Sequence, residues 1–182
     1  MDIQGKFCLN ELLKDAREVA ISGHVRPDGD CVGSCLGLWN YIREAFPAIS
    51  CHVYLEPIPQ RFGFLHGADQ VRVEKPDQPY DLFFCLDCNS AYRLGKNAAL
   101  MELAKTIVCI DHHIYNGKFA DYEYIDPEAS SASELVCILA GVENLSVHAS
   151  EALYTGIAHD HFQPPFKNRS RAYTQANGPA IQ

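Results

Sequence analysis

The sequence predicts an α/β domain of three layers, in which a mainly parallel sheet is covered by helices on both faces. Short apolar runs of strand length alternate along the chain with longer segments of helical character. Two of these runs, residues 82–86 and 107–110, are continuously apolar, which is typical of parallel strands buried on both faces. With 182 residues, 47% of them hydrophobic, the chain is long enough for one substantial core and too short for two.

The first half of the chain alternates helix and strand. Residues 10–17 are expected to form a short helix with Asn10 as its N-cap, and residues 19–22 a buried strand. Residues 30–46 read as a long, mostly apolar helix, which Pro47 stops because proline cannot continue a helix.

The second half continues this alternation around the two apolar runs. Residues 50–55 alternate like a strand, and a helix over residues 97–105 separates the two runs. Ser131 and Glu134 have the spacing of a capping box in front of an apolar stretch, which predicts another helix. Residues 150–157 are also expected to be helical.

Composition excludes several classes of protein. The net charge of −8 argues against a protein that coats duplex DNA, because such binding needs a basic surface. No apolar run approaches the ~18–20 residues that cross a bilayer, and the acidic N-terminus is unlike a signal peptide. The eight cysteines are scattered, and Cys85-x-x-Cys88 lacks the second pair of a structural zinc site. We therefore expect a cytoplasmic protein with free thiols and no membrane partner.

The composition changes near residue 161. Residues 161–182 contain three basic residues and no acidic ones, whereas residues 1–160 contain all 23 acidic residues and 12 basic ones, a net charge of −11. The last segment also lacks any sustained apolar period. We expect residues 1–160 to be the domain and residues 161–182 to be a poorly packed tail.

Acidic and histidine side chains follow three of the expected strands. They are His24, Asp28, Asp30, Asp87, Asp111, His112 and His113. The carboxyl ends of parallel strands lie at one edge of a sheet, so these side chains are expected to converge there. Because clustered carboxylates repel one another unless cations lie between them, the pattern predicts a metal centre. Carboxylate and imidazole ligands without thiolate suit manganese, and also magnesium, iron or cobalt.

The first of these segments has an informative spacing. Asp28 and Asp30 flank Gly29, so that one tight turn can direct two carboxylates to neighbouring metal positions. Gly33 and Ser34 fall in the first turns of the following helix, where free N–H groups favour a phosphate. Taken alone, the two aspartates could equally be turn and N-cap residues, but their combination with the later strand ends favours a metal role.

Together these motifs carry a family resemblance. In chain order they are His24-x-x-x-Asp28-x-Asp30, Gly33-Ser34, Asp87, Asp111-His112-His113, and Tyr154-Thr155-Gly156-Ile157 leading to Asp160. Over residues 1–160 the chain resembles the DHH phosphoesterase superfamily and, within it, the bifunctional oligoribonuclease and 3′-phosphoadenosine 5′-phosphate (pAp) phosphatase group. The resemblance implies a sheet of about five strands, phosphoester hydrolysis, and two Mn²⁺ ions per chain, with Mg²⁺ or Co²⁺ as alternatives.

The resemblance also implies two ligand sets that share one aspartate. The first set is His24, Asp28 and Asp87, and the second is Asp30, Asp87, His112 and Asp160. A bridging role suits Asp87 because a carboxylate has two oxygens to share.

Three further residues receive roles around these sets. By the resemblance, His113 would face the scissile phosphate, and Asp111 would orient its neighbours more than bind metal. Arg93 has two alternatives of equal weight, a phosphate contact or a contact within the turn near Asp87. His159 lies beside Asp160 but is given no role.

The chain departs from the family pattern after Asp160. The family continues there with Thr-Gly and later has a glycine-rich substrate-binding domain, whereas this sequence continues with residues 161–165, HFQPP, and we expect that domain to be absent. We expect the tail to derive from truncation or a frame shift of a longer parent, which would leave the substrate pocket half present.

Three functions follow as hypotheses. The first is a manganese-dependent phosphoesterase that acts on short RNA oligonucleotides or pAp. The second is a cyclic dinucleotide phosphodiesterase or a manganese pyrophosphatase. The third is a truncated remnant that binds metal or nucleotide with little or no turnover. A homodimer is compatible with all three.

Overall fold

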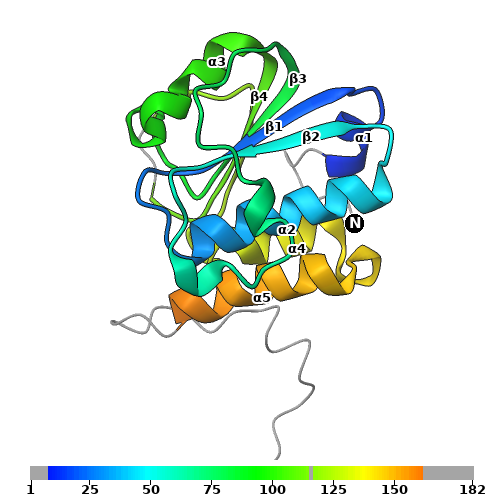
Figure 1. Ribbon diagram of the computed structural model, residues 1–182, viewed down its shortest axis with the longest axis vertical. Coiled ribbons are helices and arrows are strands. Elements are labelled where there is room, and N and C mark those ends of the chain that lie inside the picture. The colour runs from blue at the N-terminus through cyan, green and yellow to red at the C-terminus, as the bar shows by residue number, and fades with distance from the viewer. Residues whose placement is uncertain (1–7, 115–116, 162–182) are drawn as a thin grey trace, which may run out of the picture.

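A five-stranded, entirely parallel sheet lies at the centre of the computed structural model, which describes residues 8–114 and 117–161 (Figure 1). The strands are β1 (Glu18–Ser22), β2 (Ser50–Tyr54), β3 (Tyr80–Leu86), β4 (Ala104–Asp111) and β5 (Tyr122–Ile125). Their order in the sheet is β2-β1-β3-β4-β5, and every neighbouring pair is parallel. The prediction of a mainly parallel, five-stranded α/β fold is confirmed.

Helices cover both faces of this sheet. The α-helices are α1 (Leu9–Leu13), α2 (Gly29–Ala45), α3 (Leu100–Leu103), α4 (Ala132–Ala140) and α5 (Val147–His161). The 3₁₀ helices are η1 (Gln60–Phe62), η2 (Ala68–Gln70), η3 (Ala91–Ala99) and η4 (Val142–Asn144). Figure 1 shows α2, α4 and α5 together on one face and α3 on the other. Among the described residues, no helix is both long enough and apolar enough to cross a membrane.

The larger hydrophobic core lies between the sheet and the layer of α2, α4 and α5. A smaller core, with Tyr80 and Phe83 among its members, fills the opposite face under η3 and α3. Between the sheet and α5, helix α2 is buried along most of its length. Gly33 permits this close packing, because a Cβ added there would lie only 2.6 Å from the carbonyl oxygen of Ala152 in α5.

Several expected element boundaries differ from the structure. The first helix spans Leu9–Leu13, and Asn10 is not its cap but accepts a hydrogen bond from the Tyr41 hydroxyl at 2.7 Å. The helix expected over residues 97–105 is replaced by η3 and the short α3, because its last two residues already belong to β4. The edge strand β5 was not predicted, since its four residues, of which Tyr124 alone is buried, give little apolar pattern.

Two helix starts place side chains for the site. The Asp28 carboxylate caps α2 by accepting hydrogen bonds from the N–H groups of Asp30 and Cys31, each at 3.1 Å. Ser131 caps α4 as predicted, with the Glu134 N–H at 3.0 Å. The Glu134 carboxylate departs from the capping box and accepts hydrogen bonds from the N–H and hydroxyl of Ser130.

The expected tail lies almost entirely outside the described residues. His161, its first residue, is the last residue of α5 and therefore belongs to the helix. The expectations about residues 162–182 concern residues that the structure does not describe.

Candidate metal centre

Nine aspartate and histidine side chains form four overlapping groups at the carboxyl edge of the sheet. The groups are Asp87, Asp111, His112 and His113; His24, Asp28 and Asp87; Asp30, His112 and Asp160; and Asp28, His159 and Asp160. In each group the possible ligand atoms lie within 4.8 Å of one another. They come from the loops after β1, β3 and β4, from the last residue of β4, from the start of α2, and from the end of α5. All the metal ligands proposed from the sequence are thus brought together.

His24, Asp28 and Asp87 form the first group. His24 Nε2 lies 3.3 Å from Asp87 Oδ2 and 3.7 Å from Asp28 Oδ1. The other ring nitrogen, Nδ1, lies 2.8 Å from the carbonyl oxygen of Val25 and donates its proton there. This hydrogen bond leaves Nε2 as the nitrogen available to a metal ion.

His112 is at the centre of the second group. Its Nε2 lies 3.4 Å from Asp160 Oδ2 and 3.7 Å from Asp30 Oδ2. It also lies 3.6 Å from Asp87 Oδ1, so that Asp87 directs one oxygen toward each group. For comparison, two ligand atoms bound at right angles to one ion at about 2.1 Å lie about 3 Å apart.

The backbone of Asp87 is adapted to this central position. Its φ of 51° is in the left-handed region, which aspartate tolerates better than most residues. The Asp87 N–H donates to the carbonyl oxygen of Ile110 at 3.1 Å, which holds the turn against β4. The strained turn thereby directs the carboxylate between His24 and His112.

Unpaired buried atoms show that a cation fits this centre. Within the described part of the chain, Asp87 Oδ1 and His112 Nε2 are buried and have no hydrogen-bond partner. Leaving buried polar atoms unpaired costs about 1–3 kcal/mol each, and a metal ion would remove that cost for both. Carboxylate and imidazole donors without thiolate fit a Mn²⁺-like ion.

Asp30 lies deepest in the cluster. Its carboxylate accepts hydrogen bonds from the N–H groups of Ala132 at 2.7 Å and Ser133 at 2.9 Å, at the start of α4. Burial raises the pKa of Asp30, and the nearby carboxylates of Asp87 and Asp160 raise it further. These neighbours would repel one another as anions, so a divalent cation is the natural counter-charge.

Asp111 holds His113 at the edge of the centre. Asp111 Oδ1 accepts hydrogen bonds from the N–H groups of His112 and His113, and from His113 Nδ1 at 2.8 Å. The hydrogen bond with Asp111 is the largest cause of the raised pKa of His113. With Nδ1 occupied and 40% of the side chain exposed, His113 has its Nε2 available to a substrate.

The phosphate-binding roles expected for Gly33 and Ser34 are not supported. Helix α2 begins at Gly29, one residue earlier than predicted, and Asp28 already accepts the N–H groups of its first turn. Ser34 is fully buried, and its hydroxyl donates to the carbonyl oxygen of Asp30 at 2.7 Å. Gly33 faces α5.

Arg93 makes a defined contact through its backbone. Its carbonyl oxygen accepts a hydrogen bond from the Val25 N–H at 2.7 Å, which ties η3 to the loop that carries His24. This backbone contact involves the loop after β1, so it does not decide between the two roles expected for Arg93. A phosphate contact by its half-buried side chain remains a proposal.

His159 belongs to the centre although sequence reasoning gave it no role. It is grouped with Asp28 and Asp160, and its Nδ1 lies 3.4 Å from Asp160 Oδ1. Its position next to Asp160 was the available signal. That signal is weak, because consecutive side chains on a helix point in different directions. Only the packing of α5 on α2 decides whether His159 reaches the centre.

Binding of metal to this centre is expected to release protons. Burial lowers the pKa of both His24 and His112, but neighbouring aspartates outweigh burial and raise the values to about 11 and about 9. Both rings are therefore protonated at pH 7.5 and must become neutral to bind a metal ion. We expect these two rings to release about two protons per chain, and any proton held by Asp30 would add to that number. Calorimetric Mn²⁺ titrations in buffers of different ionisation enthalpy measure this number, and a buffer-independent heat would contradict the prediction.

Comparisons with known proteins agree on one family. Residues 18–157 match the DHH family, N-terminal domain. The bifunctional oligoribonuclease and PAP phosphatase NrnA of Bacillus subtilis is 28% identical over 169 residues, which cover 90% of this chain and 52% of that protein. The cyclic-di-AMP phosphodiesterase GdpP of Geobacillus thermodenitrificans is 29% identical, with 93% of this chain and 28% of that protein covered.

A solved structure shares the fold. An exopolyphosphatase-related protein from Bacteroides fragilis superimposes with a TM-score of 0.81 at 26% sequence identity. The similarity covers 90% of this chain and 52% of that protein. The chain therefore spans about half the length of the NrnA relative and of this structural neighbour.

Proposed function

Since this chain belongs to the DHH family, whose N-terminal domain matches residues 18–157, we propose that it is a manganese-dependent phosphoesterase domain. Members of this family are metal-dependent phosphoesterases. The position of Asp87 carries the proposal, because its two oxygens face His24 and His112 and so link two adjacent ligand groups. Two divalent ions there would neutralise the phosphate oxygens and activate the water that attacks phosphorus.

Hydrogen bonds within the chain hold His113 and two of the proposed metal ligands in position. Asp111 fixes the tautomer of His113, so that the His113 Nε2 can contact a phosphate oxygen or the leaving group. Val25 fixes the orientation of His24 in the same way. The start of α4 holds Asp30 through two N–H groups. These contacts keep the ligands in place before a substrate arrives, which lowers the cost of reaching the transition state.

A groove beside the centre supports a nucleotide substrate. It has a volume of about 440 Å³ and lies between the segments that follow β3 and β4, close in sequence to Asp87 and His113. It is lined by Asn89, Ser90, Ala91, Ile114, Gly117, Lys118 and Phe119. Apolar and aromatic side chains offer contact to a base, and the Lys118 ammonium offers a charge for a second phosphate.

Short oligoribonucleotides and pAp are the substrates we propose, as for the NrnA relatives. The chain corresponds to about half of such a protein, and we propose that base discrimination comes mainly from a second domain. On this basis the isolated chain should bind the phosphate group and distinguish bases poorly.

The eight free cysteines accord with a reducing compartment, and we place the reaction in the cytoplasm.

A substrate panel tests the proposal. The chain, stripped of metal and reloaded with Mn²⁺, is incubated with pAp, a ribodinucleotide, cyclic di-AMP or pyrophosphate, and the products are separated by chromatography. We expect hydrolysis of pAp and the dinucleotide. Replacing His113 with asparagine is expected to lower the rate about a hundredfold or more, the usual effect of losing a proton-transfer or oxyanion contact.

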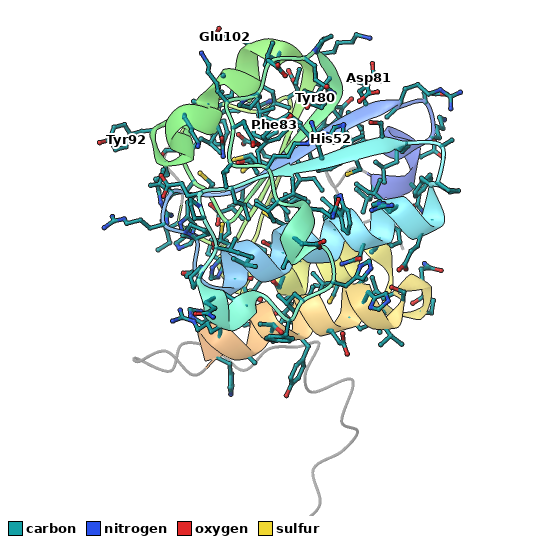
Figure 2. The ribbon with its side chains drawn as sticks, in the orientation of Figure 1. His52, Tyr80, Asp81, Phe83, Tyr92 and Glu102 are labelled. Atoms are coloured by element: carbon teal, nitrogen blue, oxygen red, sulfur yellow. The ribbon has the colours of Figure 1, made fainter. Side chains whose placement is uncertain are left out.

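A matched histidine provides the control. His52 lies beside Tyr80 on the sheet face opposite α2, with ring centroids 6.0 Å apart, and it belongs to none of the four groups (Figure 2). His52→Asn should leave the rate unchanged. Preferential cleavage of pyrophosphate or cyclic di-AMP would favour those alternatives. Binding of Mn²⁺ without any hydrolysis would favour a binding remnant.

A further inference from the structure

We propose that a pocket at the β2 edge of the sheet binds a small molecule that carries a phosphate group. This site is separate from the metal centre and goes beyond the proposed function. The pocket has a volume of about 420 Å³, within the range of about 300–1,000 Å³ that is usual for small-molecule sites. Its lining includes Trp39, Arg43, Ser50, Cys51, Gln70 and Arg72.

The pocket lies far from the metal centre along α2. Figure 1 shows β2 beside the later turns of α2, and the two elements are in contact. Arg43 is in the last turn of this helix, 13 positions after Asp30, which is in its first turn. At about 1.5 Å per residue, these two positions are about 20 Å apart along the helix axis. A ligand in the pocket would therefore not touch the metal ions, and its binding can be measured without them.

Two guanidinium groups give the pocket a positive charge. Arg43 stacks on the ring of Trp39, with its Cζ 4.5 Å from the ring centroid, and Arg72 Nη1 donates to the Tyr54 hydroxyl at 3.1 Å. Among the residues that the structure describes, neither guanidinium forms an ion pair with a carboxylate, and no aspartate or glutamate lines the pocket. In a chain with a net charge of −8, two such cations around one pocket indicate a site for an anion.

The backbone of β2 adds a hydrogen-bond donor. This strand lies at the end of the sheet order, so one of its edges pairs with no other strand of the sheet. The Ser50 N–H donates to the carbonyl oxygen of Arg17 on the β1 side at 2.8 Å, whereas the Cys51 carbonyl oxygen accepts from Trp39 Nε1 on the outer side at 3.0 Å. The N–H and C=O groups of one strand residue point to the same side, so the Cys51 N–H also points outward, where the pocket lies.

The groups around the pocket are held in place before a ligand arrives. The backbone of Arg72 is bound to the end of β2, because its N–H donates to the Val53 carbonyl oxygen at 2.8 Å and its own carbonyl oxygen accepts from the Leu55 N–H at 3.2 Å. The ring of Trp39, on which Arg43 stacks, is buried and fixed by its hydrogen bond to β2. Groups that are already ordered lose little conformational entropy on binding.

The charge and the size of the pocket favour a phosphate monoester. At pH 7 such a group carries about 1.5 to 2 negative charges, which two guanidinium groups complement better than they complement the single charge of a carboxylate. The forked N–H donors of arginine also match the geometry of phosphate oxygens. A volume in the range of small-molecule sites leaves room for an organic part, such as a nucleoside, beside the phosphate.

Calorimetric titration of the metal-free chain tests this inference. The chain is freed of metal on a chelating resin and titrated with AMP, inorganic phosphate or adenosine. We expect AMP and phosphate to bind and adenosine not to bind. Tighter binding of AMP would identify a nucleotide as the ligand, and equal affinities would identify the phosphate ion, and either result supports the site. Adenosine that binds as tightly as AMP, or a chain that binds neither AMP nor phosphate, overturns the inference.

Arginine variants show whether the anion binds in this pocket. Arg43→Gln and Arg72→Gln should each lower the affinity for AMP about tenfold or more, the usual effect of losing a charge-assisted hydrogen bond. Arg61→Gln is the matched control, because Arg61 also stacks on an aromatic ring, that of Phe62, but does not line the pocket. It should leave the affinity unchanged. Equal affinity in the wild type and in both pocket variants overturns the inference.

Two further measurements keep the test decisive. Far-UV circular dichroism checks the fold of each variant, and Arg43→Gln suffices if Arg72→Gln does not fold, because Arg43 is exposed on a helix that glutamine tolerates. In NMR spectra of the ¹⁵N-labelled chain, AMP should shift the amide signal of Cys51. Shifts confined to the groove beside the metal centre, at Ser90 and Lys118, would place the anion there and overturn the inference.

Discussion

Asp87→Asn is expected to remove Mn²⁺ from both metal positions at once. The carboxylate lies between His24 and His112 and offers one oxygen to each ligand group, whereas an amide offers one neutral oxygen and an N–H₂ that repels a cation. Losing a residue that only hydrogen-bonds to a metal ligand already lowers metal affinity or activity about 10–100-fold. Losing the ligand shared by both ions should therefore lower them more. Equilibrium dialysis and hydrolysis of pAp measure both effects.

Two companion variants make this result specific. His24→Ala removes a ligand from the first group alone and should weaken mainly one ion. Glu102→Gln makes a comparable acid-to-amide change at an exposed position of α3, outside the four groups, and should change neither property (Figure 2). Metal binding by Asp87→Asn that equals the wild type would refute the bridging assignment.

Manganese is expected to raise the melting temperature by about 10–20 °C relative to the metal-free chain. Two ions, each at a hundred times its Kd, stabilise the folded state by about 5 kcal/mol together. One kcal/mol shifts the melting temperature of a domain of this size by about 2–4 °C. The shift is large because the buried carboxylates of Asp30 and Asp87 and the half-buried carboxylate of Asp160 repel one another until a cation lies between them.

The pH dependence of this stabilisation has a definite sign. The pKa values of His24 and His112, about 11 and about 9, are raised in the folded, metal-free chain. The protonated rings stabilise the folded, metal-free chain by the full amount below about pH 6.5, the pKa of a histidine in the unfolded chain. This stabilisation is lost as the pH rises through the pKa values of the folded chain. Because bound metal replaces those protons, the Mn²⁺-induced shift should be larger at pH 8 than at pH 6. Melting curves at both pH values, with Mn²⁺ or with EDTA, measure it. An equal shift in Asp87→Asn would contradict the assignment.

The sequence by itself determined the fold class and the position of the centre. Continuous apolar runs predict buried parallel strands, and parallel strands end at one edge of their sheet. The positions of residues that directly follow strands, such as Asp87 and His112, can therefore be predicted from the local apolar pattern and from the rule that parallel strands end at one edge. The seven aspartates and histidines predicted at the strand ends, together with Asp160, all lie in the four groups.

Only the tertiary structure decided how the helices contribute. Gly33 had the spacing of a phosphate-binding residue, but the crossing of α2 and α5 uses it for backbone packing. The N–H groups at the start of α4 hold Asp30 from about a hundred residues away in sequence, which no local pattern indicates. His159 enters the centre because α5 lies against the glycine at the first turn of α2. Strand periodicity is local, whereas the rotation and approach of packed helices depend on side-chain contacts between distant segments, and those contacts decide which helix residues reach the metal centre.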